Sequence, residues 1–282
     1  MRDPKPKKSL GQNFLRDKAV LEKIIKSANL SVDDFVLEVG PGEGILTERL
    51  LKHAKKVVAI EIDKDLALKL GSRLRGNDKA EIVNADILEI NLPKLIEKNT
   101  KIHLATNPHH LQERGDNMHS YKVIANIPYY ITSPIIRLFL ETKYPPKEML
   151  LMVQKEVAKR ICAKAGKLSI LALSVQYYAS AELLFTVPAK AFFPIPEVDS
   201  AIIRITRSKQ QEIGSKEEAK KFFSIVKAGF SAKRKTLVNN LSSSLKLDKY
   251  DVEEKLKQIE ISPNQRAQEL NLENWKKLTE LL

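Results

Sequence analysis

The sequence predicts an α/β fold, with a mainly parallel, doubly wound sheet followed by a small all-α domain. Short apolar stretches typical of buried strands alternate with helical patterns between residues 35 and 205. A glycine-rich segment directly follows the first of these strands, and only helical patterns follow residues 207–214. We therefore expect two domains, residues 1–206 and residues 207–282.

A basic arm precedes the first predicted helix. Prolines keep the start of segment Pro4–Arg16 extended, and Lys5, Lys7 and Lys8 carry charges that suit contact with phosphate groups. Asp17 follows as the predicted N-cap of a helix whose apolar residues share one face. We expect the arm to contact a ligand.

The first predicted strand, residues 35–39, leads into Gly40, Gly42 and Gly44. Glycine permits positive φ angles and lets backbone N–H groups approach a ligand closely, while the following helix N-terminus adds partial positive charge. The spacing is Glu-x-Gly-x-Gly-x-Gly, so the third glycine comes one residue too early for a dinucleotide fold. The pattern is typical of the S-adenosylmethionine loop of Rossmann-like methyltransferases and indicates that cofactor.

Two further predicted strands end in a carboxylate. Residues 57–61 end in Glu61, which is placed to accept hydrogen bonds from a ribose diol. After a helix near residues 64–74, residues 81–86 end in Asp86, which is placed to contact an adenine amino group. Because open α/β sheets bind ligands at the carboxyl ends of their strands, both acids are candidate cofactor-binding residues.

The segment Asn99–Ser120 is polar and has no periodicity. It holds four of the five histidines, which are His103, His109, His110 and His119. A metal site is conceivable, but there is neither a regular ligand spacing nor an acidic cluster, so we expect a solvated loop and no metal.

The motif after the next strand, residues 121–125, is the predicted catalytic site. Pro128 has no N–H and biases Ile127 towards extended backbone, so carbonyl groups can point out of the strand end beside the Asn126 amide oxygen. An exocyclic adenine amine needs acceptors for its two hydrogens, and Tyr129 offers a ring face for stacking. The alternative is an ordinary strand-to-helix turn with Tyr129 in the core.

The remaining pattern completes the sheet and then changes. A helix is expected around residues 134–141, and the predicted strands that follow are residues 149–153, 183–187 and 198–205. Helices are predicted at residues 155–163, 168–179, 217–230, 237–245, 252–259 and 272–282. A stiff loop before the last strand presents Phe193.

The net charge limits the classes of partner that the protein is expected to bind. Lys and Arg outnumber Asp and Glu by 48 to 35, and the net charge of +13 favours a polyanion. RNA, DNA and an anionic membrane all fit this charge, as does a basic surface that only confers solubility. The densest basic cluster in the helical segment is Lys233, Arg234 and Lys235, for which a solvated helix end is the alternative.

The rest of the composition concerns the compartment. Cys162 is the single cysteine, so no intrachain disulfide and no cysteine-based metal cluster is possible. No apolar h-region follows Met1, and no run approaches the roughly 18 apolar residues that a membrane span needs. We expect a soluble, cytoplasmic monomer that has no membrane partner.

Taken together, the motifs resemble those of the rRNA adenine dimethyltransferases, and within them the dimethyladenosine transferase family that modifies small-subunit rRNA. The resemblance runs from about Lys7 to the C-terminus. Its carriers are Leu10-Gly11-Gln12-Asn13-Phe14-Leu15, Glu38-Val39-Gly40-Pro41-Gly42-Glu43-Gly44, Glu61, Asp86, Asn126-Ile127-Pro128-Tyr129, Val153-Gln154-Lys155-Glu156-Val157 and Phe193-Pro194-Ile195-Pro196-Glu197-Val198-Asp199-Ser200.

This resemblance implies a class I methyltransferase sheet with an antiparallel last strand, a methyltransferase domain at residues 1–206 and a helical RNA-binding domain at residues 207–282. It implies that Tyr129 and Phe193 hold the target adenine between them. The residues implied to line the cofactor site are Asn13, Leu15, Gly40, Glu61, Asp86 and Asn126. One departure is that Asn99–Ser120 looks inserted relative to the family pattern.

The expected activity is N6,N6-dimethylation of two adjacent adenosines in small-subunit rRNA or its subunit precursor. The first alternative is the antibiotic-resistance type of adenine dimethyltransferase, which shares most motifs but acts on large-subunit rRNA. The second is a non-catalytic RNA-binding assembly or transcription factor, which would be expected to lack the cofactor acids or the Asn126 motif. Both are present here.

Overall fold

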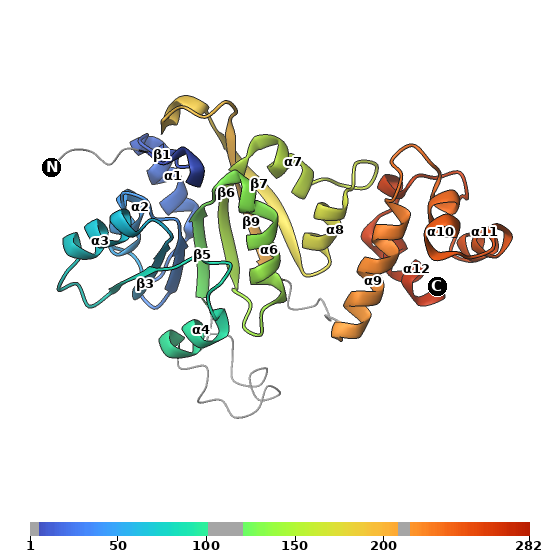
Figure 1. The fold of residues 1–282 in the computed structure, drawn as a ribbon, viewed down its shortest axis with the longest axis horizontal. Helices are drawn as coiled ribbons and strands as arrows, with labels where there is room; N and C mark the ends of the chain where they lie inside the picture. The colour runs from blue at the N-terminus through green and yellow to red at the C-terminus, as the bar shows by residue number, and fades with distance from the viewer. Residues whose placement is uncertain (1–5, 101–120, 208–214) are drawn as a thin grey trace. The chain divides into compact units, whose positions relative to one another are not determined.

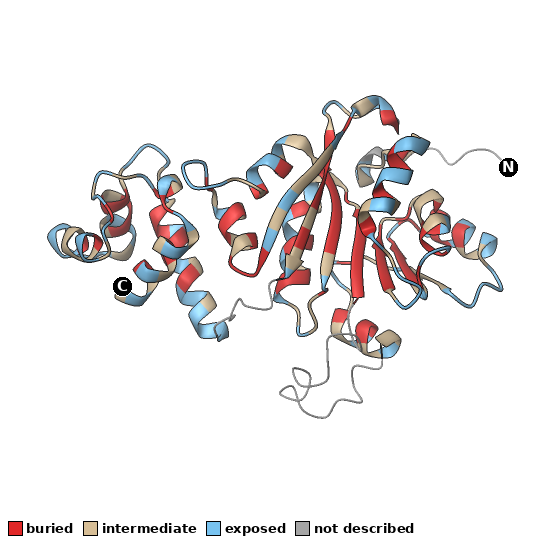
Figure 2. Ribbon diagram, turned by 180° about the vertical axis from the view of Figure 1, so that it is seen from behind, coloured by how far each residue is buried: buried red, intermediate tan, exposed pale blue. Residues whose placement is uncertain are grey.

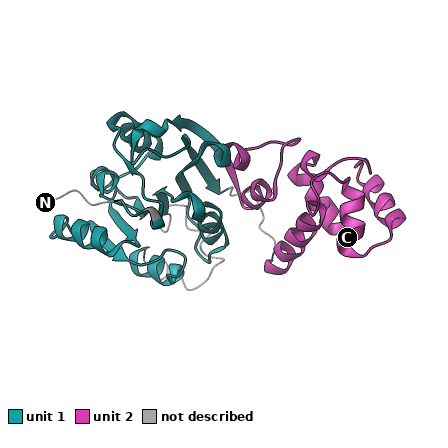
Figure 3. Ribbon diagram, turned by 45° about the horizontal axis from the view of Figure 1, so that its top comes forward, with its two compact units in different colours: residues 1–158, 182–207 teal, residues 159–181, 208–282 magenta. Residues whose placement is uncertain are grey.

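The computed structural model describes residues 6–100, 121–207 and 215–282 (Figure 1). The chain divides into two compact units, which are described separately (Figure 3). The first unit comprises residues 1–158 and 182–207, and the second comprises residues 159–181 and 208–282. Residues 159–181, which the sequence placed with the sheet, thus fall in the second unit.

The first unit is built on a seven-stranded sheet with the order β4-β3-β2-β5-β6-β9-β7. Strands β4 to β6 in this order pair in parallel, whereas β9 is antiparallel to β6, which confirms the predicted sheet. The bounds are β2 Phe35–Val39, β3 Lys56–Glu61, β4 Ala80–Asn84, β5 Tyr121–Asn126, β6 Glu148–Gln154, β7 Ala179–Val187 and β9 Ser200–Arg207. Strand β2 lies between β3 and β5, so the chain adds β3 and β4 on one side of β2 and then β5 and β6 on the other side. Open α/β sheets bind ligands at this change in strand order.

Helices flank this sheet, and several start where the sequence supplies a cap. Asp17 accepts hydrogen bonds from the N–H groups of Ala19 and Val20, as predicted for the first helix. The helices of this part of the chain are α1 Lys18–Ala28, α2 Ile45–Leu50, α3 Lys64–Arg73, α4 Leu92–Thr100, α6 Thr132–Glu141 and α7 Lys155–Ile161. Figure 2 shows the central strands as mainly buried, whereas the edge strand β7 is largely intermediate or exposed.

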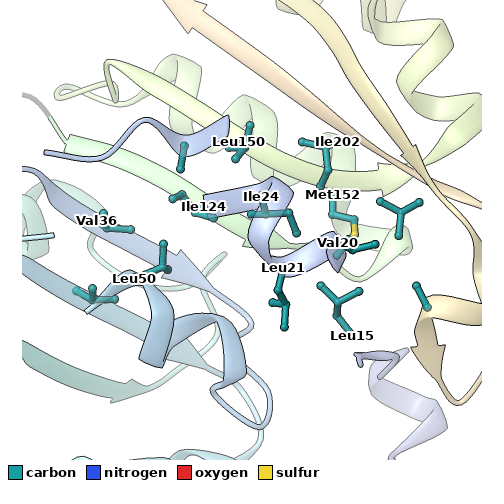
Figure 4. Packing of buried hydrophobic residues seen from close by; sticks show 14 of the residues in the cluster. Leu15, Val20, Leu21, Ile24, Val36, Leu50, Ile124, Leu150, Met152 and Ile202 are labelled. Atoms are coloured by element: carbon teal, nitrogen blue, oxygen red, sulfur yellow. The ribbon is translucent and has the colours of Figure 1, made fainter. Parts of the chain in front are cut away.

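Apolar side chains of α1 hold the arm against the sheet. Leu21 and Ile24 are buried in one cluster with Ile124 of β5, Met152 of β6 and Leu15 of the arm (Figure 4). Burial of a leucine or isoleucine of this kind stabilises a fold by about 1.5–3 kcal/mol each. The arm is therefore part of the packed core up to Leu15.

Three details of the sheet differ from the sequence prediction. Strand β4 ends at Asn84, so Asp86 lies two residues beyond the strand and does not end it. Strand β7 begins at Ala179 and not at residue 183, and its first residues are small or polar because β7 lies at the sheet edge. A separate two-stranded antiparallel sheet joins β1, Phe14–Leu15, to β8, Phe192–Phe193. Strands of two residues carry no periodicity, so the sequence did not predict them.

The second unit is helical. Within it Tyr177, predicted to be a core residue, packs against Phe222 with ring centroids 4.5 Å apart. Trp275 is fully buried and stacks on Phe230, and a side chain at Gly229 would collide with the Trp275 ring. The helices are α8 Ile170–Gln176, α9 Lys216–Gly229, α10 Leu237–Leu245, α11 Lys249–Gln258 and α12 Leu272–Leu281.

Candidate active site

A cavity of about 240 Å³ lies in the first unit at the carboxyl ends of β2, β3 and β5. Its walls come from the N-terminal arm, the glycine loop and the motif that follows β5. Among its lining residues are Asn13, Leu15, Gly40, Gly42, Glu61, Asp86, Asn126, Ile127, Pro128 and Tyr129. The structure therefore brings together all the residues predicted for the cofactor and four of the five predicted for the chemistry.

All three glycines of the loop have positive φ angles, and the two that line the cavity show why glycine is needed there. Gly40 has φ +69°, and a Cβ there would lie 3.3 Å from the Asn126 carbonyl oxygen. Gly42 has φ +56°, and a Cβ there would lie 3.1 Å from the Phe14 ring. Both angles fall in the region that disfavours side chains, so the loop keeps its backbone close to the cavity.

Glu61 lies at the end of β3 and is held by the loop. Its Oε2 accepts a hydrogen bond of 2.9 Å from the Gly42 N–H, and its Oε1 accepts one of 2.9 Å from the Asp63 N–H. Burial raises the pKa of this carboxyl, and these two backbone N–H groups oppose the shift. Each oxygen retains a lone pair, so the group can still accept hydrogen bonds from a diol.

Glu38, on β2, is a second acid of the cavity and was not among the predicted site residues. It is only 2% exposed. Burial raises the pKa of its carboxyl to about 8, the Thr47 hydroxyl opposes this, and the nearby Glu61 charge adds to it. Its place as the first residue of the glycine motif was the signal that could have identified it.

Asp86 lines the cavity together with two apolar residues, Ile62 and Leu88. Its Oδ1 accepts a hydrogen bond of 2.9 Å from the Leu88 N–H, which leaves its other oxygen without a partner among the described residues. Leu88 and Ile62 line the cavity although their side chains are exposed. Exposed apolar groups beside a carboxylate are suited to a heteroaromatic ring with an amino group. The available sequence signal was an apolar residue one position after Glu61 and two positions after Asp86.

Asn126 ends β5 and is oriented by the arm. Its Nδ2 donates a hydrogen bond of 3.2 Å to the Asn13 carbonyl oxygen. Since the NH₂ side is used in this way, Oδ1 is the group left to accept a hydrogen bond. The Ile127 carbonyl also accepts no hydrogen bond within the described part of the chain. Two acceptors are therefore available side by side in the chain.

The two aromatic residues predicted to hold the target base differ in their surroundings. Tyr129 is half-buried, and its hydroxyl lies 2.8 Å from the Oγ of the fully buried Ser200. Phe193 is 58% exposed and is not among the cavity-lining residues. It pairs across the small sheet with Phe14, which does line the cavity. Because Tyr129 is only half-buried and lines the cavity, it is not a core residue of an ordinary turn.

The basic residues of the arm do not all match the expectation. Lys7 was predicted to contact phosphate, but its Nζ lies 2.7 Å from Asp63 Oδ1 and 2.9 Å from Asp65 Oδ2. Burial acts to raise the pKa of Asp63, yet the hydrogen bonds from Lys7 and Gln12 hold it below its usual range. Lys5 lies outside the described residues, and the side chain of Lys8 is not described.

The second predicted basic cluster forms an ordered turn in the helical unit. Lys233, Arg234 and Lys235 are exposed in the turn before α10. Buried Asn240 donates hydrogen bonds to the carbonyl oxygens of Gly229 and Ala232, which fixes this turn. The cluster is thus presented by defined backbone.

Metal and membrane features can be reported for the described residues alone. In residues 6–100, 121–207 and 215–282, no three His, Cys, Asp or Glu side chains are arranged to hold a metal ion. Nor does any helix there have the length and apolar character needed to cross a bilayer. The four histidines of the segment 101–120 lie outside the described residues.

This fold and cavity define a class I methyltransferase that uses S-adenosylmethionine. The strand order and the antiparallel strand β9 define the sheet, and the glycine loop with Glu61 and Asp86 fits a nucleoside cofactor that has no pyrophosphate. The sequence matches the family described as ribosomal RNA adenine dimethylase over residues 4–282. The chain belongs to this family of enzymes.

Relatives and solved structures agree with this assignment. A protein of Fusobacterium nucleatum named ribosomal RNA small subunit methyltransferase A is 43% identical over 279 residues, covering 98% of this chain and 97% of that protein. One of the same name from Dehalococcoides mccartyi is 40% identical, covering 97% and 87%. A dimethyladenosine transferase from Plasmodium falciparum has a TM-score of 0.75 at 26% identity, covering 94% and 95%, and the 23S rRNA methyltransferase ErmE has 0.71 at 28%, covering 96% and 99%.

Proposed function

We propose that this enzyme transfers methyl groups from S-adenosylmethionine to N6 of two adjacent adenosines in small-subunit rRNA, giving N6,N6-dimethyladenosine. The observation that carries the proposal is the Asn126 amide, which its bond to the Asn13 carbonyl leaves with Oδ1 as an acceptor at the cavity wall. Glu61 would bind the ribose of the cofactor, and Asp86 would bind its adenine. Asn13, Leu15, Gly40 and Gly42 would complete that site.

The cofactor, when bound, supplies an electrophilic methyl group on a sulfonium sulfur. Asn126 Oδ1 and the Ile127 carbonyl would each accept one N–H of the target amine, so that the nitrogen lone pair is aimed at the methyl carbon. The Asn126 amide and the Ile127 carbonyl are not bases, so the amine would release one proton to solvent for each methyl group that it accepts. Pro128 supports this arrangement because it fixes the backbone between the acceptors and Tyr129.

The target adenine would lie between Tyr129 and Phe193. A base must leave its stack before its N6 atom can be reached, and stacking on a protein ring replaces part of the stacking energy that the base gives up. Each aromatic contact of this kind is worth about 1–3 kcal/mol. Phe193 is exposed, so its ring is accessible for stacking on a base.

The choice of the small subunit rests on the relatives named above, since ErmE shows that the same fold serves large-subunit rRNA. The test is incubation with labelled S-adenosylmethionine and either purified small subunits or purified large subunits. We expect label on adjacent adenosines of the small-subunit rRNA. Label confined to a large-subunit adenosine would establish the alternative.

RNA docking would use the ordered turn with Lys233, Arg234 and Lys235, together with Lys5 and Lys8 of the arm. Neutralising the three residues of the turn should flatten the dependence of log affinity on log salt by up to about 0.7–0.9 for each phosphate interaction that is removed. The matched control neutralises Lys216, Lys220 and Lys221, which are exposed on α9 and carry the same total charge. Equal effects in both variants would show that net charge, and not this turn, attracts the RNA.

We further propose that the protein acts as a cytoplasmic monomer without a membrane partner. Sedimentation of the purified protein, with and without small subunits, tests the monomer. A stable dimer at the concentrations that support methylation would contradict it.

A further inference from the structure

One buried carboxylate, that of Asp63 just after β3, binds the start of the N-terminal arm, whose later residues are also held by the pairing of β1 with β8 and by Leu15 in the core. Lys7 Nζ donates to Asp63 Oδ1 at 2.7 Å, and Gln12 Nε2 donates to Asp63 Oδ2 at 2.8 Å. Within the arm, the Lys7 N–H donates to Gln12 Oε1 at 2.8 Å, which closes a ring of hydrogen bonds. The Asp63 side chain is 2% exposed, so neither of its oxygens relies on water.

The same carboxylate lies next to the proposed ribose acid. Asp63 is two residues after Glu61, and its N–H donates to Glu61 Oε1 at 2.9 Å. Its Oδ1 also accepts a hydrogen bond of 3.1 Å from the Asp65 N–H and so caps α3. The segment that presents Glu61 to the cavity is therefore also the segment that holds the arm.

The anchored part of the arm leads directly to the catalytic amide. Gln12 is bound to Asp63, and the next residue, Asn13, accepts the hydrogen bond from Asn126 Nδ2. If the arm leaves the cavity, Asn126 loses the acceptor that separates its NH₂ side from its oxygen side. The position of the arm and the orientation of Asn126 are thus linked through the peptide bond between Gln12 and Asn13.

We propose that Asp63 is a positioning residue which, by binding Lys7 and Gln12, fixes the N-terminal arm over the cofactor site and so orients Asn126. This inference rests on the proposed roles of Glu61 and Asn126. It assigns Lys7 to closure of the cofactor site and not to the RNA backbone, because its ammonium is already bound by two carboxylates.

The first experiment compares Lys7→Met with Lys7→Arg and with Lys64→Met, an exposed neighbour on α3 that serves as the charge-matched control. Titration calorimetry with S-adenosylhomocysteine should show about 3- to 10-fold weaker binding for Lys7→Met, the scale of a charged hydrogen bond reduced by partial exposure. Lys7→Arg should restore most of the affinity, and Lys64→Met should equal wild type. Wild-type affinity in Lys7→Met would overturn the proposal.

The second experiment separates positioning from simple loss of structure. Amide hydrogen exchange of residues 6–16 should be faster in Lys7→Met and Gln12→Leu, while exchange of β2, β3 and β5 stays as in wild type. At saturating cofactor, both variants should still have reduced kcat for methylation with an unchanged KM for RNA. Unchanged exchange in the arm, or unchanged kcat, would overturn the link to Asn126.

The remaining outcome concerns RNA. If Lys7→Met lowered the salt slope of RNA binding by about 0.7–0.9 and left S-adenosylhomocysteine binding intact, Lys7 would be a phosphate contact and the proposal would fall. Because S-adenosylhomocysteine binding is measured without RNA, the calorimetric comparison is independent of which rRNA the enzyme modifies. A failure of the small-subunit assignment would therefore leave this test unaffected.

Discussion

The two halves of the cavity are built by different means. The cofactor half contains acids bound by backbone N–H groups: buried Glu61 binds those of Gly42 and Asp63, and half-buried Asp86 binds that of Leu88. The base half has less buried rings. Phe193, which is outside the cavity lining, is 58% exposed, and Tyr129 is half-buried with its hydroxyl bound to Ser200. One half is thus complete in the free protein, whereas the other offers surface that a nucleotide would cover.

This difference fits the two proposed ligands. A cofactor that is the same molecule in every reaction cycle benefits from a preformed site, because little ordering of the protein is needed on binding. An RNA base has to be drawn from its own stack, so exposed rings that take over its stacking are more useful than fixed hydrogen bonds. Asn126 lies where the two halves meet.

The largest effect is expected at that meeting point. Asn126→Ala should reduce the single-turnover methylation rate by about 10²–10³, the scale of losing one preorganised hydrogen-bonding group that acts in the transition state. The KM for RNA should change little, because the rings and the basic residues still bind it. Rates within about threefold of wild type would contradict the role of this amide.

The cofactor half is tested by Glu61→Ala. Binding of S-adenosylmethionine should weaken by about 1.5–3 kcal/mol, the usual range for hydrogen bonds to a charged group. Glu81→Ala, which removes a carboxylate from β4 outside the cavity lining, is the matched control and should leave cofactor affinity unchanged. Calorimetry that showed comparable affinity for NAD would contradict the interpretation of the glycine loop.

The base half is tested by Tyr129→Ala and Phe193→Ala. Each should lose about 1–3 kcal/mol of transition-state stabilisation, measured as kcat/KM, with cofactor affinity retained. Tyr129→Phe keeps the ring but leaves the buried Ser200 hydroxyl unpaired, so a smaller loss of about 0.5–1.5 kcal/mol is expected. If the phenylalanine variant were as inactive as the alanine variant, the hydroxyl would be the working group.

The smallest effect on activity, and a clear one on stability, is expected from Glu38→Gln. The carboxyl has a pKa of about 8 in the folded protein against an ordinary value of 4.5, so the folded state holds a proton that the unfolded state releases between these values. Its contribution to stability is therefore complete below the ordinary value and disappears as pH rises through the folded pKa. The unfolding midpoint of cofactor-free Glu38→Gln, relative to that of wild type, should be higher at about pH 9 than at about pH 6. An equal difference at both values would exclude this titration.

The same contrast explains what the sequence could predict. Gly40, Gly42, Glu61, Asp86 and the Asn126 motif all follow strands, so their place at one edge of the sheet followed from local pattern and the rule for parallel sheets. Chain periodicity has no information about pairs of distant residues. For this reason the sequence did not predict the bond between Lys7 and Asp63, or the bond between Tyr129 and Ser200.

Residues 159–181 group with the helical unit, whereas the sequence pattern placed them with the sheet, for a related reason. The apolar pattern of α8 is equally suitable for packing on a sheet or on another helix. Its partner is decided by Phe222, which packs on Tyr177 from a segment far along the chain. Similarly, β7 begins earlier than predicted because an edge strand tolerates polar residues on both faces.

The small sheet that joins β1 to β8 affects the order in which parts of the enzyme fold during synthesis. Phe14 pairs with Phe193, and the Arg16 N–H donates to the Ala191 carbonyl oxygen at 2.8 Å. A ribosome releases the N-terminal residues first, and closing a loop as long as this one has to wait for its distant end. A nascent chain that stops before Phe192 therefore contains the glycine loop and both cofactor acids but lacks the strand that pairs with the arm. Strand β1 can therefore pair with β8 only after Phe192 and Phe193 have been synthesised.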